Sequence, residues 1–262
     1  MRIALGLEYA GSAFRGWQSQ CGGGTVQDAL EAALAKIAGS PVATVAAGRT
    51  DAGVHASAQV VHFDVEVDRP EMAWVRGVNT HLPDEIAVNW ARRVPADFHA
   101  RFSAELRHYR YYLLNRATRP GALAGRIGWD FHPLDVDRMA EAASLLIGRH
   151  DFSAFRAAEC QAKSPIRDLG RATVSAAGGF VVFEFSANAF LHHMIRNLVG
   201  CLVYVGKGAR PPAWIGELLE QRDRRLAAPT FMPDGLYLAG IDYAEHWGLP
   251  SGPVPVFPWE CR

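Results

Sequence analysis

The order of strand and helix patterns along the chain is the feature that most constrains its fold. Residues 2–9 alternate apolar and polar side chains, as a half-buried strand does. A helix is expected from Thr25, a suitable N-cap with Asp28 three residues later, to the stop at Gly39-Ser40-Pro41. The first half therefore has the order β-α-β-β-α-β, completed by strand patterns over residues 42–47, 59–67 and 86–94 and a helix over residues 70–79.

The second half repeats this order with little residue identity. Its expected strands cover residues 106–114, 167–176, 180–187 and 236–243, and its helices cover residues 135–147, 189–205 and, as an extra short helix, 211–221. The Gly178-Gly179 pair between two of these strands is typical of a hairpin. Two such units predict an α+β fold with two ferredoxin-like halves, each an antiparallel sheet with helices on one face.

The boundary between the halves is expected near residues 96–103. We expect an N-terminal half of residues 1–100, a C-terminal half of residues 101–246 and an extended, proline-rich tail of residues 247–262. Two sheets side by side leave a cleft between the halves, and such interfaces commonly hold ligand sites.

The composition is that of a globular protein with an ample core, because 49% of the 262 residues are hydrophobic and 21% are charged. The formal net charge is zero, so bulk charge does not indicate a polyanionic partner. Nearly all of the 27 basic residues are arginines, the exceptions being Lys36, Lys163 and Lys207. Arginine suits contacts with phosphates and bases, but the same bias also follows from genome composition. Both interpretations stay open.

The cellular compartment is suggested by the cysteines and by the apolar runs. Cys21, Cys160, Cys201 and Cys261 are widely spaced, as is typical of reduced thiols in a cytosolic protein. The first ten residues include Glu8 and offer no small-residue cleavage site, so they do not resemble a signal peptide. The longest apolar run, residues 198–206, is too short for a membrane span. We expect a cytoplasmic protein without a membrane segment.

Residues 10–24 form a loop rich in glycine and serine that also carries Phe14, Arg15 and Trp17. Aromatic side chains beside arginine suit contacts with nucleic acid. A loop pinned by its own aromatic side chains explains the pattern equally well. The run of glycines at residues 22–24 lacks the Lys-Ser/Thr of a P-loop, which argues against nucleoside triphosphate binding there.

The stretch Gly48-Arg49-Thr50-Asp51-Ala52-Gly53-Val54-His55-Ala56 joins two expected strands of the first half. Glycines permit close approach of a ligand to the backbone, and loops on a rigid scaffold often hold catalytic groups. The simpler interpretation is a turn in which Asp51 bonds to its own backbone and Arg49 is solvated.

With several other segments, this stretch resembles the tRNA pseudouridine synthase A family. The matching segments are Phe98-His99-Ala100-Arg101-Phe102-Ser103, Tyr109-Arg110-Tyr111, Asp151-Phe152-Ser153, residues 188–197 and Gly235-Leu236-Tyr237-Leu238. The resemblance extends from Tyr9-Ala10-Gly11 to Asp242-Tyr243, nearly the whole chain. Several such segments in the order that the family has make the resemblance specific. They imply the pseudouridine synthase fold, with its catalytic cleft between the halves.

The resemblance implies an isomerase that cuts uracil from C1′ of a uridine, turns it and rejoins it through C5. Asp51 is then the catalytic carboxylate, which either attacks the nucleotide covalently or assists departure of the base. Arg196 is the implied ion-pair partner that keeps this carboxylate ionised. Tyr109 is implied to stack on the target base and is a candidate general base for removal of the C5 proton.

Further substrate contacts are implied for three residues. Leu236 would pack against the other face of the base, and Arg49 and His55 would contact phosphates or the flipped nucleotide. Extrusion of the uridine is expected because stacking hides its glycosidic bond, and unstacking costs only a few kcal/mol. The chemistry needs no cofactor and no metal. We do not expect a metal site at His192-His193, because adjacent residues on a helix diverge and no acidic residue lies near the pair in the sequence.

The implied substrate is tRNA, at uridines 38, 39 and 40 of the anticodon stem-loop, and the implied assembly is a homodimer. One alternative is a non-catalytic RNA-binding protein or chaperone that uses ferredoxin-like halves as a platform. Another is a nucleosidase-type hydrolase, although glycosidases normally use two carboxylates and Asp51 has no second acid in its motif.

Overall fold

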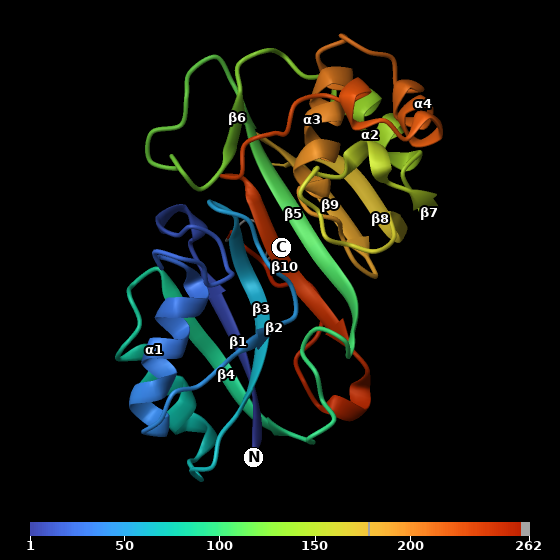
Figure 1. Ribbon diagram of the computed structural model, residues 1–262. Coiled ribbons are helices and arrows are strands. Elements are labelled where there is room, and N and C mark those ends of the chain that lie inside the picture. Colours follow the sequence, from blue (N-terminus) through green and yellow to red (C-terminus); the bar gives the residue numbers. More distant parts are fainter. Residues whose placement is uncertain (178, 258–262) are drawn as a thin grey trace. The chain divides into compact units, whose positions relative to one another are not determined.

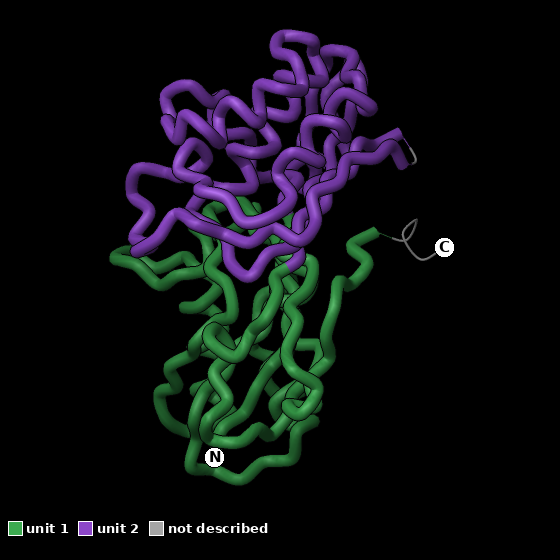
Figure 2. Tube along the Cα trace, turned by 90° about the vertical axis from the view of Figure 1, so that its right-hand side faces the viewer, with its two compact units in different colours: residues 1–107, 237–262 green, residues 108–236 purple. Residues whose placement is uncertain are grey.

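The computed structural model describes residues 1–177 and 179–257, and its compact units are residues 1–107 with 237–257, here called unit 1, and residues 108–236, here called unit 2 (Figure 2). This division follows packing, whereas the predicted halves follow the repeated order of elements. The halves of residues 1–100 and 101–246 therefore stay a prediction. Part of the predicted tail, residues 258–262, lies outside the described residues, as does Gly178 of the predicted hairpin.

Unit 1 begins with strand β1 (Arg2–Tyr9) and helix α1 (Val26–Ala38) (Figure 1). Thr25 caps the helix as predicted, because its side chain and that of Asp28 form a capping box. Gly39 ends it in the left-handed conformation, at φ 75°. Leu30 and Leu34 form the core of its apolar face and are fully buried.

The remaining strands of unit 1 are β2 (Val45–Ala46), β3 (His55–Asp64), β4 (Ile86–Val94) and, except for its first residue, β10 (Leu236–Tyr243). Their order is β4-β1-β3-β10, with β2 also on β3, and only the β10–β3 pairing is parallel. A helical segment containing the π-turn Ala73–Gly77 precedes β4 within the predicted helix. Its Gly77 packs against Ile37 of α1.

Strand β3 begins four residues earlier than the predicted strand of residues 59–67. Its first residues pair with β10, in the register Tyr237↔His55 and Leu238↔Ala56. That partner is distant in sequence, so the local alternation of residues 59–67 did not reveal the extension. The end of the Gly48–Ala56 stretch is consequently part of a strand rather than of a loop.

Unit 2 contains most of β5 (Ala104–Asn115), together with β6 (Gly128–Asp130), β7 (Gly148–Asp151), β8 (Ile166–Ala177) and β9 (Phe180–Ala187). Its strand order is β5-β9-β8-β7, with β6 on β5, and β7–β8 and β8–β9 are antiparallel. Its helices are α2 (Val136–Ser144), α3 (Met194–Gly206) and α4 (Trp214–Gln221). The α+β class is confirmed, with mostly antiparallel strands.

Helix α3 begins five residues later than the predicted helix of residues 189–205. His193, directly before it, has a left-handed backbone with φ 59°, which interrupts a right-handed helix. The helix is nearly all buried and packs on α2, where Met139 contacts Gly206. Among the described residues, no helix is long and apolar enough to cross a membrane.

Candidate active site

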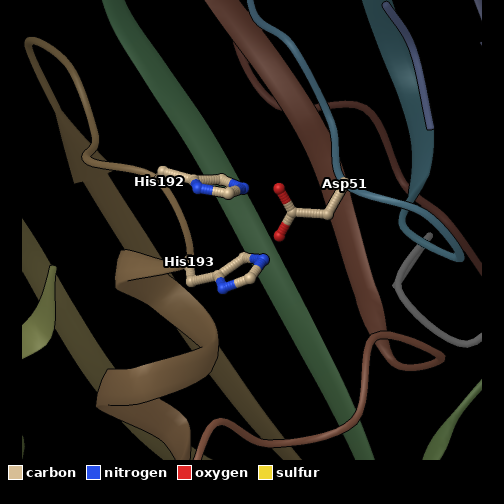
Figure 3. A group of neighbouring side chains, drawn as sticks. All are labelled: Asp51, His192 and His193. Carbon is tan, nitrogen blue, oxygen red and sulfur yellow. The ribbon is translucent and has the colours of Figure 1, made fainter. Parts of the chain in front are cut away.

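The loop that carries Asp51 runs from β2 to β3 in unit 1, and Figure 3 shows the Asp51 side chain on it. Gly53 has φ 81°, which favours glycine, and the Val54 amide donates to the Asp51 carbonyl at 3.1 Å. Arg49 is exposed, Thr50 is buried and Asp51 is half-buried. The turn thus lies partly at the surface between the buried Thr50 and Val54, and it leaves part of the Asp51 side chain accessible.

Buried polar side chains hold the base of this loop. The Gln59 amide nitrogen donates to the Gly48 carbonyl at 2.6 Å, and the Tyr9 hydroxyl lies 2.8 Å from the Thr50 hydroxyl. Gln59 is fully buried, and burial raises the pKa of Tyr9 to about 12. The Tyr9 phenol therefore stays neutral across the physiological range and holds Thr50 next to Asp51.

The raised pKa of Tyr9 predicts a loss of stability at high pH. An unperturbed tyrosine has a pKa of 10.0, so an unfolded Tyr9 ionises before the folded one does. Its contribution is complete below pH 10 and is lost as the pH rises to about 12, and at a cost of 1.36 kcal/mol per unit it amounts to about 3 kcal/mol. Urea unfolding should show that the free energy of unfolding falls less between pH 8 and pH 11 in Tyr9→Phe than in the wild type. An equal fall in both proteins would contradict the raised pKa of Tyr9.

His55 is fully buried at the start of β3. Its Nδ1 accepts a hydrogen bond from the Gly11 amide at 3.0 Å, so Nδ1 carries no proton in this contact. Its ring stacks on Tyr237 with centroids 4.6 Å apart. This burial favours a role for His55 in positioning the loop, and the expected contact with a phosphate or nucleotide stays a prediction.

Tyr109 lies on β5 in unit 2 and is 8% exposed. Its ring meets Phe190 edge to face at 5.1 Å. The neighbouring Tyr111 and Tyr112 are fully buried, and Tyr111 donates to the Met232 carbonyl at 3.1 Å. Tyr111 and Tyr112 thus fill the core, while Tyr109 retains a small exposed surface.

Arg196 lies in the first turn of α3, where two hydrogen bonds tie it to Phe231. Its Nε donates to the Phe231 carbonyl at 2.9 Å, and the Phe231 amide donates to the Arg196 carbonyl at 3.2 Å. The backbone contact orients the guanidinium group, so Arg196 is not a mobile surface arginine.

The next residue, Asn197, is a structural centre that the sequence did not reveal. It is fully buried, and its amide nitrogen donates to the Phe155 carbonyl at 2.8 Å. Its oxygen accepts from Thr230 at 2.7 Å and from Arg224 at 3.0 Å. These bonds fix the segment that holds Arg196. The only sequence signal was the position of Asn197 at the end of a matching segment.

Leu236 and the histidine pair complete the predicted positions in unit 2. Leu236 is buried, and its amide donates to the Pro233 carbonyl at 2.8 Å. His192 and His193 lie immediately before α3 rather than within a helix (Figure 3). Their ring centroids are 4.0 Å apart, so the expectation that a helix separates these side chains was wrong. The expectation that no metal binds at this pair is a separate one, and it stays a prediction.

The predicted site residues fall into two sets. Arg49, Asp51 and His55 belong to unit 1, and Tyr109, Arg196 and Leu236 belong to unit 2. The predicted pairing of Asp51 with Arg196 joins residues of different units and stays a prediction. Sequence reasoning also missed the partners of the Asp51 loop in the segment from Tyr9 to Trp17, although the resemblance began there.

Comparisons with known proteins agree with this arrangement of motifs. A family model described as tRNA pseudouridine synthase matches residues 7–103 and 142–244. The tRNA pseudouridine synthase A of Dechloromonas aromatica is 64% identical over 251 residues, covering 96% of each chain. That of Aromatoleum aromaticum is 61% identical over 259 residues, covering 98% of each chain. The chain belongs to the tRNA pseudouridine synthase A family.

Proposed function

We propose that this chain converts uridine to pseudouridine at positions 38, 39 and 40 in the anticodon stem-loop of tRNA. It is an isomerase: the bond from N1 of uracil to C1′ breaks, a bond from C5 to C1′ forms, C5 loses its proton and N1 gains one. The reaction neither oxidises nor reduces its substrate. The observation that carries the proposal is the Asp51 loop, which lies within the residues that the family model matches and has a fixed backbone beneath a half-buried carboxylate.

Asp51 acts at C1′ in this proposal, either by covalent attack or by assisting departure of the base. Arg196 pairs with the carboxylate in the RNA complex, and its bond to the Phe231 carbonyl supports this role because it orients the fork. Tyr109 stacks on the uracil and is the candidate acceptor of the C5 proton. Leu236 packs on the opposite face, and Arg49, which is exposed, contacts phosphate.

We also propose that each half has the ferredoxin-like arrangement. In the first half, β4 pairs with β1, β1 with β3, and β3 with β2. Across the sheet, the four strands of this half therefore lie in the order fourth, first, third, second of the chain, which supports this interpretation. In the second half, β5-β9-β8 follows the order first, third, second. The catalytic cleft lies between the halves, and the enzyme works as a homodimer in the cytoplasm, without a cofactor.

Incubation with a synthetic anticodon stem-loop tests the proposed function. The wild-type protein should form pseudouridine at one or more of the three positions while the mass of the RNA stays unchanged. A nucleosidase would instead release uracil and lower the RNA mass, and an RNA-binding protein would leave every uridine intact. Stem-loops with a single uridine at position 38, 39 or 40 give the preference among sites. Either alternative result would overturn the proposal.

A further inference from the structure

We propose that Gly16 is a positioning residue for Asp51, because its backbone lies directly against the backbone of the Asp51 loop. This inference rests on the proposed function. Gly16 belongs to residues 9–17, here called the clamp segment, which contacts the Asp51 loop at several points. A residue at position 16 with a side chain would displace the carboxylate from the reacting C1′ without removing any group that touches RNA.

The contact at Gly16 leaves too little room for a side chain unless its neighbours move. A Cβ there would lie 3.0 Å from the Thr50 carbonyl oxygen, 3.1 Å from the Ala52 nitrogen and 3.2 Å from the Asp51 carbonyl carbon. All three are backbone atoms, so the loop itself would have to shift by a few tenths of an ångström. Gly16 also has φ 93°, which disfavours residues with a Cβ.

Two further contacts of the clamp segment hold the same loop. The Trp17 amide donates to the Thr50 carbonyl at 3.0 Å, and Trp17 itself is buried. At the other end of the loop, a Cβ on Gly11 would lie 1.9 Å from the Val54 carbonyl oxygen. The Asp51 turn is therefore held on both sides, at Thr50 and at Val54.

The clamp segment is in turn anchored to helix α1. The Val26 amide donates to the Gly16 carbonyl and the Gln27 amide to the Trp17 carbonyl, each at 3.1 Å. These amides belong to the first turn of the helix, where the backbone N–H groups have no carbonyl partner within the helix. The position of Asp51 is thus fixed by a rigid helix through two backbone contacts, and a change at residue 16 is transmitted to the carboxylate.

Gly16→Ala tests the proposal, and Gly22→Ala is its matched control. Gly22 has nearly the same backbone strain, at φ 91°, but a Cβ there would meet only the end of the Arg15 side chain. Both variants should lose a few degrees of Tm. Only Gly16→Ala should lower kcat, by about tenfold, because a shift of 1 Å costs about 10²-fold and this shift is smaller. The KM for the stem-loop should stay unchanged.

If Gly16→Ala does not fold, Gly16→Asn against Gly22→Asn repeats the comparison, since asparagine tolerates positive φ better than alanine. Amide chemical shifts of residues 50–53 provide a readout that needs no activity. They should move in the Gly16 variant and not in the Gly22 variant. A kcat within threefold of Gly22→Ala, or unmoved amides, would overturn the positioning role. Failure of the proposed function would instead appear as an inactive wild type, with the amide shifts still deciding the role of Gly16.

Discussion

Replacing Asp51 with asparagine is expected to lower turnover by about 10⁴-fold or more, because a missing catalytic nucleophile costs this much in other enzymes. The amide has nearly the size of the carboxylate but cannot ionise, attack C1′ or stabilise the charge that develops as the base departs. Asp51 is only half-buried and its loop is held by Tyr9, Gly16 and Trp17, so the fold should remain intact. Single-turnover conversion of the stem-loop measures the effect.

A second aspartate separates this effect from a general loss of charge. Asp84 is exposed in the turn before β4, so Asp84→Asn removes the same charge from unit 1 without touching the Asp51 loop. It should retain wild-type turnover, and both variants should bind the stem-loop with similar affinity. An Asp51→Asn enzyme within tenfold of the wild type would remove Asp51 from the chemistry.

Arg196→Lys is expected to lower kcat by about 10²-fold, although the positive charge remains. Arginine provides an Nε donor to the Phe231 carbonyl and a planar fork for a carboxylate at the same time. Lysine has a single ammonium group, so it cannot do both. The substitution should lower kcat and leave the affinity for RNA unchanged. The kcat of Arg196→Ala should be lower than that of Arg196→Lys. The comparison uses the same single-turnover conditions as for Asp51.

Arg224→Lys is the matched control for this change. Arg224 donates to Asn197 and to the Ala228 carbonyl, and thereby supports the same segment that ends at Phe231. Its replacement should cost about 1–2 kcal/mol of stability through lost hydrogen bonds, and it should lower kcat far less than Arg196→Lys does, because Arg224 acts on the site only through the segment that it supports. Equal losses of kcat in the two variants would mean that Arg196 acts only by supporting the fold.

Strands with strong local patterns were predicted from the sequence to the residue. The predicted bounds of β1, β4, β9 and β10 agree with the structure, because alternation or an apolar run between turn residues defines each of them. The capping box of α1 was predicted equally well from Thr25 and Asp28. In these elements, local residues are sufficient to determine the bounds.

Elements that depend on distant partners were predicted less well. The start of β3 is determined by pairing with β10, and the start of α3 by the left-handed backbone of His193. The short strands β6 and β7 have no pattern of their own and exist through pairing with β5 and β8. Hydrophobic periodicity contains no information on such pairings.

The candidate site shows the same division. The roles of Asp51, Tyr109 and Arg196 were predicted from the motif resemblance alone, and they stay predictions. The residues that hold them in place were missed: the carbonyl of Phe231, the amide of Asn197 and the backbone of Gly16 act through contacts between segments far apart in sequence. A glycine with a positive φ against a catalytic backbone cannot be told from an ordinary loop glycine by sequence alone.

The central claim is that Asp51, Tyr109 and Arg196 meet at one extruded uridine. A crystal structure of Asp51→Asn bound to the anticodon stem-loop tests it most directly, since the inactive variant retains its substrate. We predict that the uracil stacks on Tyr109, that C1′ lies about 3–3.5 Å from the residue 51 side chain, the separation of a near-attack geometry, and that the Arg196 fork contacts the same side chain. A uridine that remains stacked in the RNA, or an Arg196 turned away from residue 51, would contradict the claim.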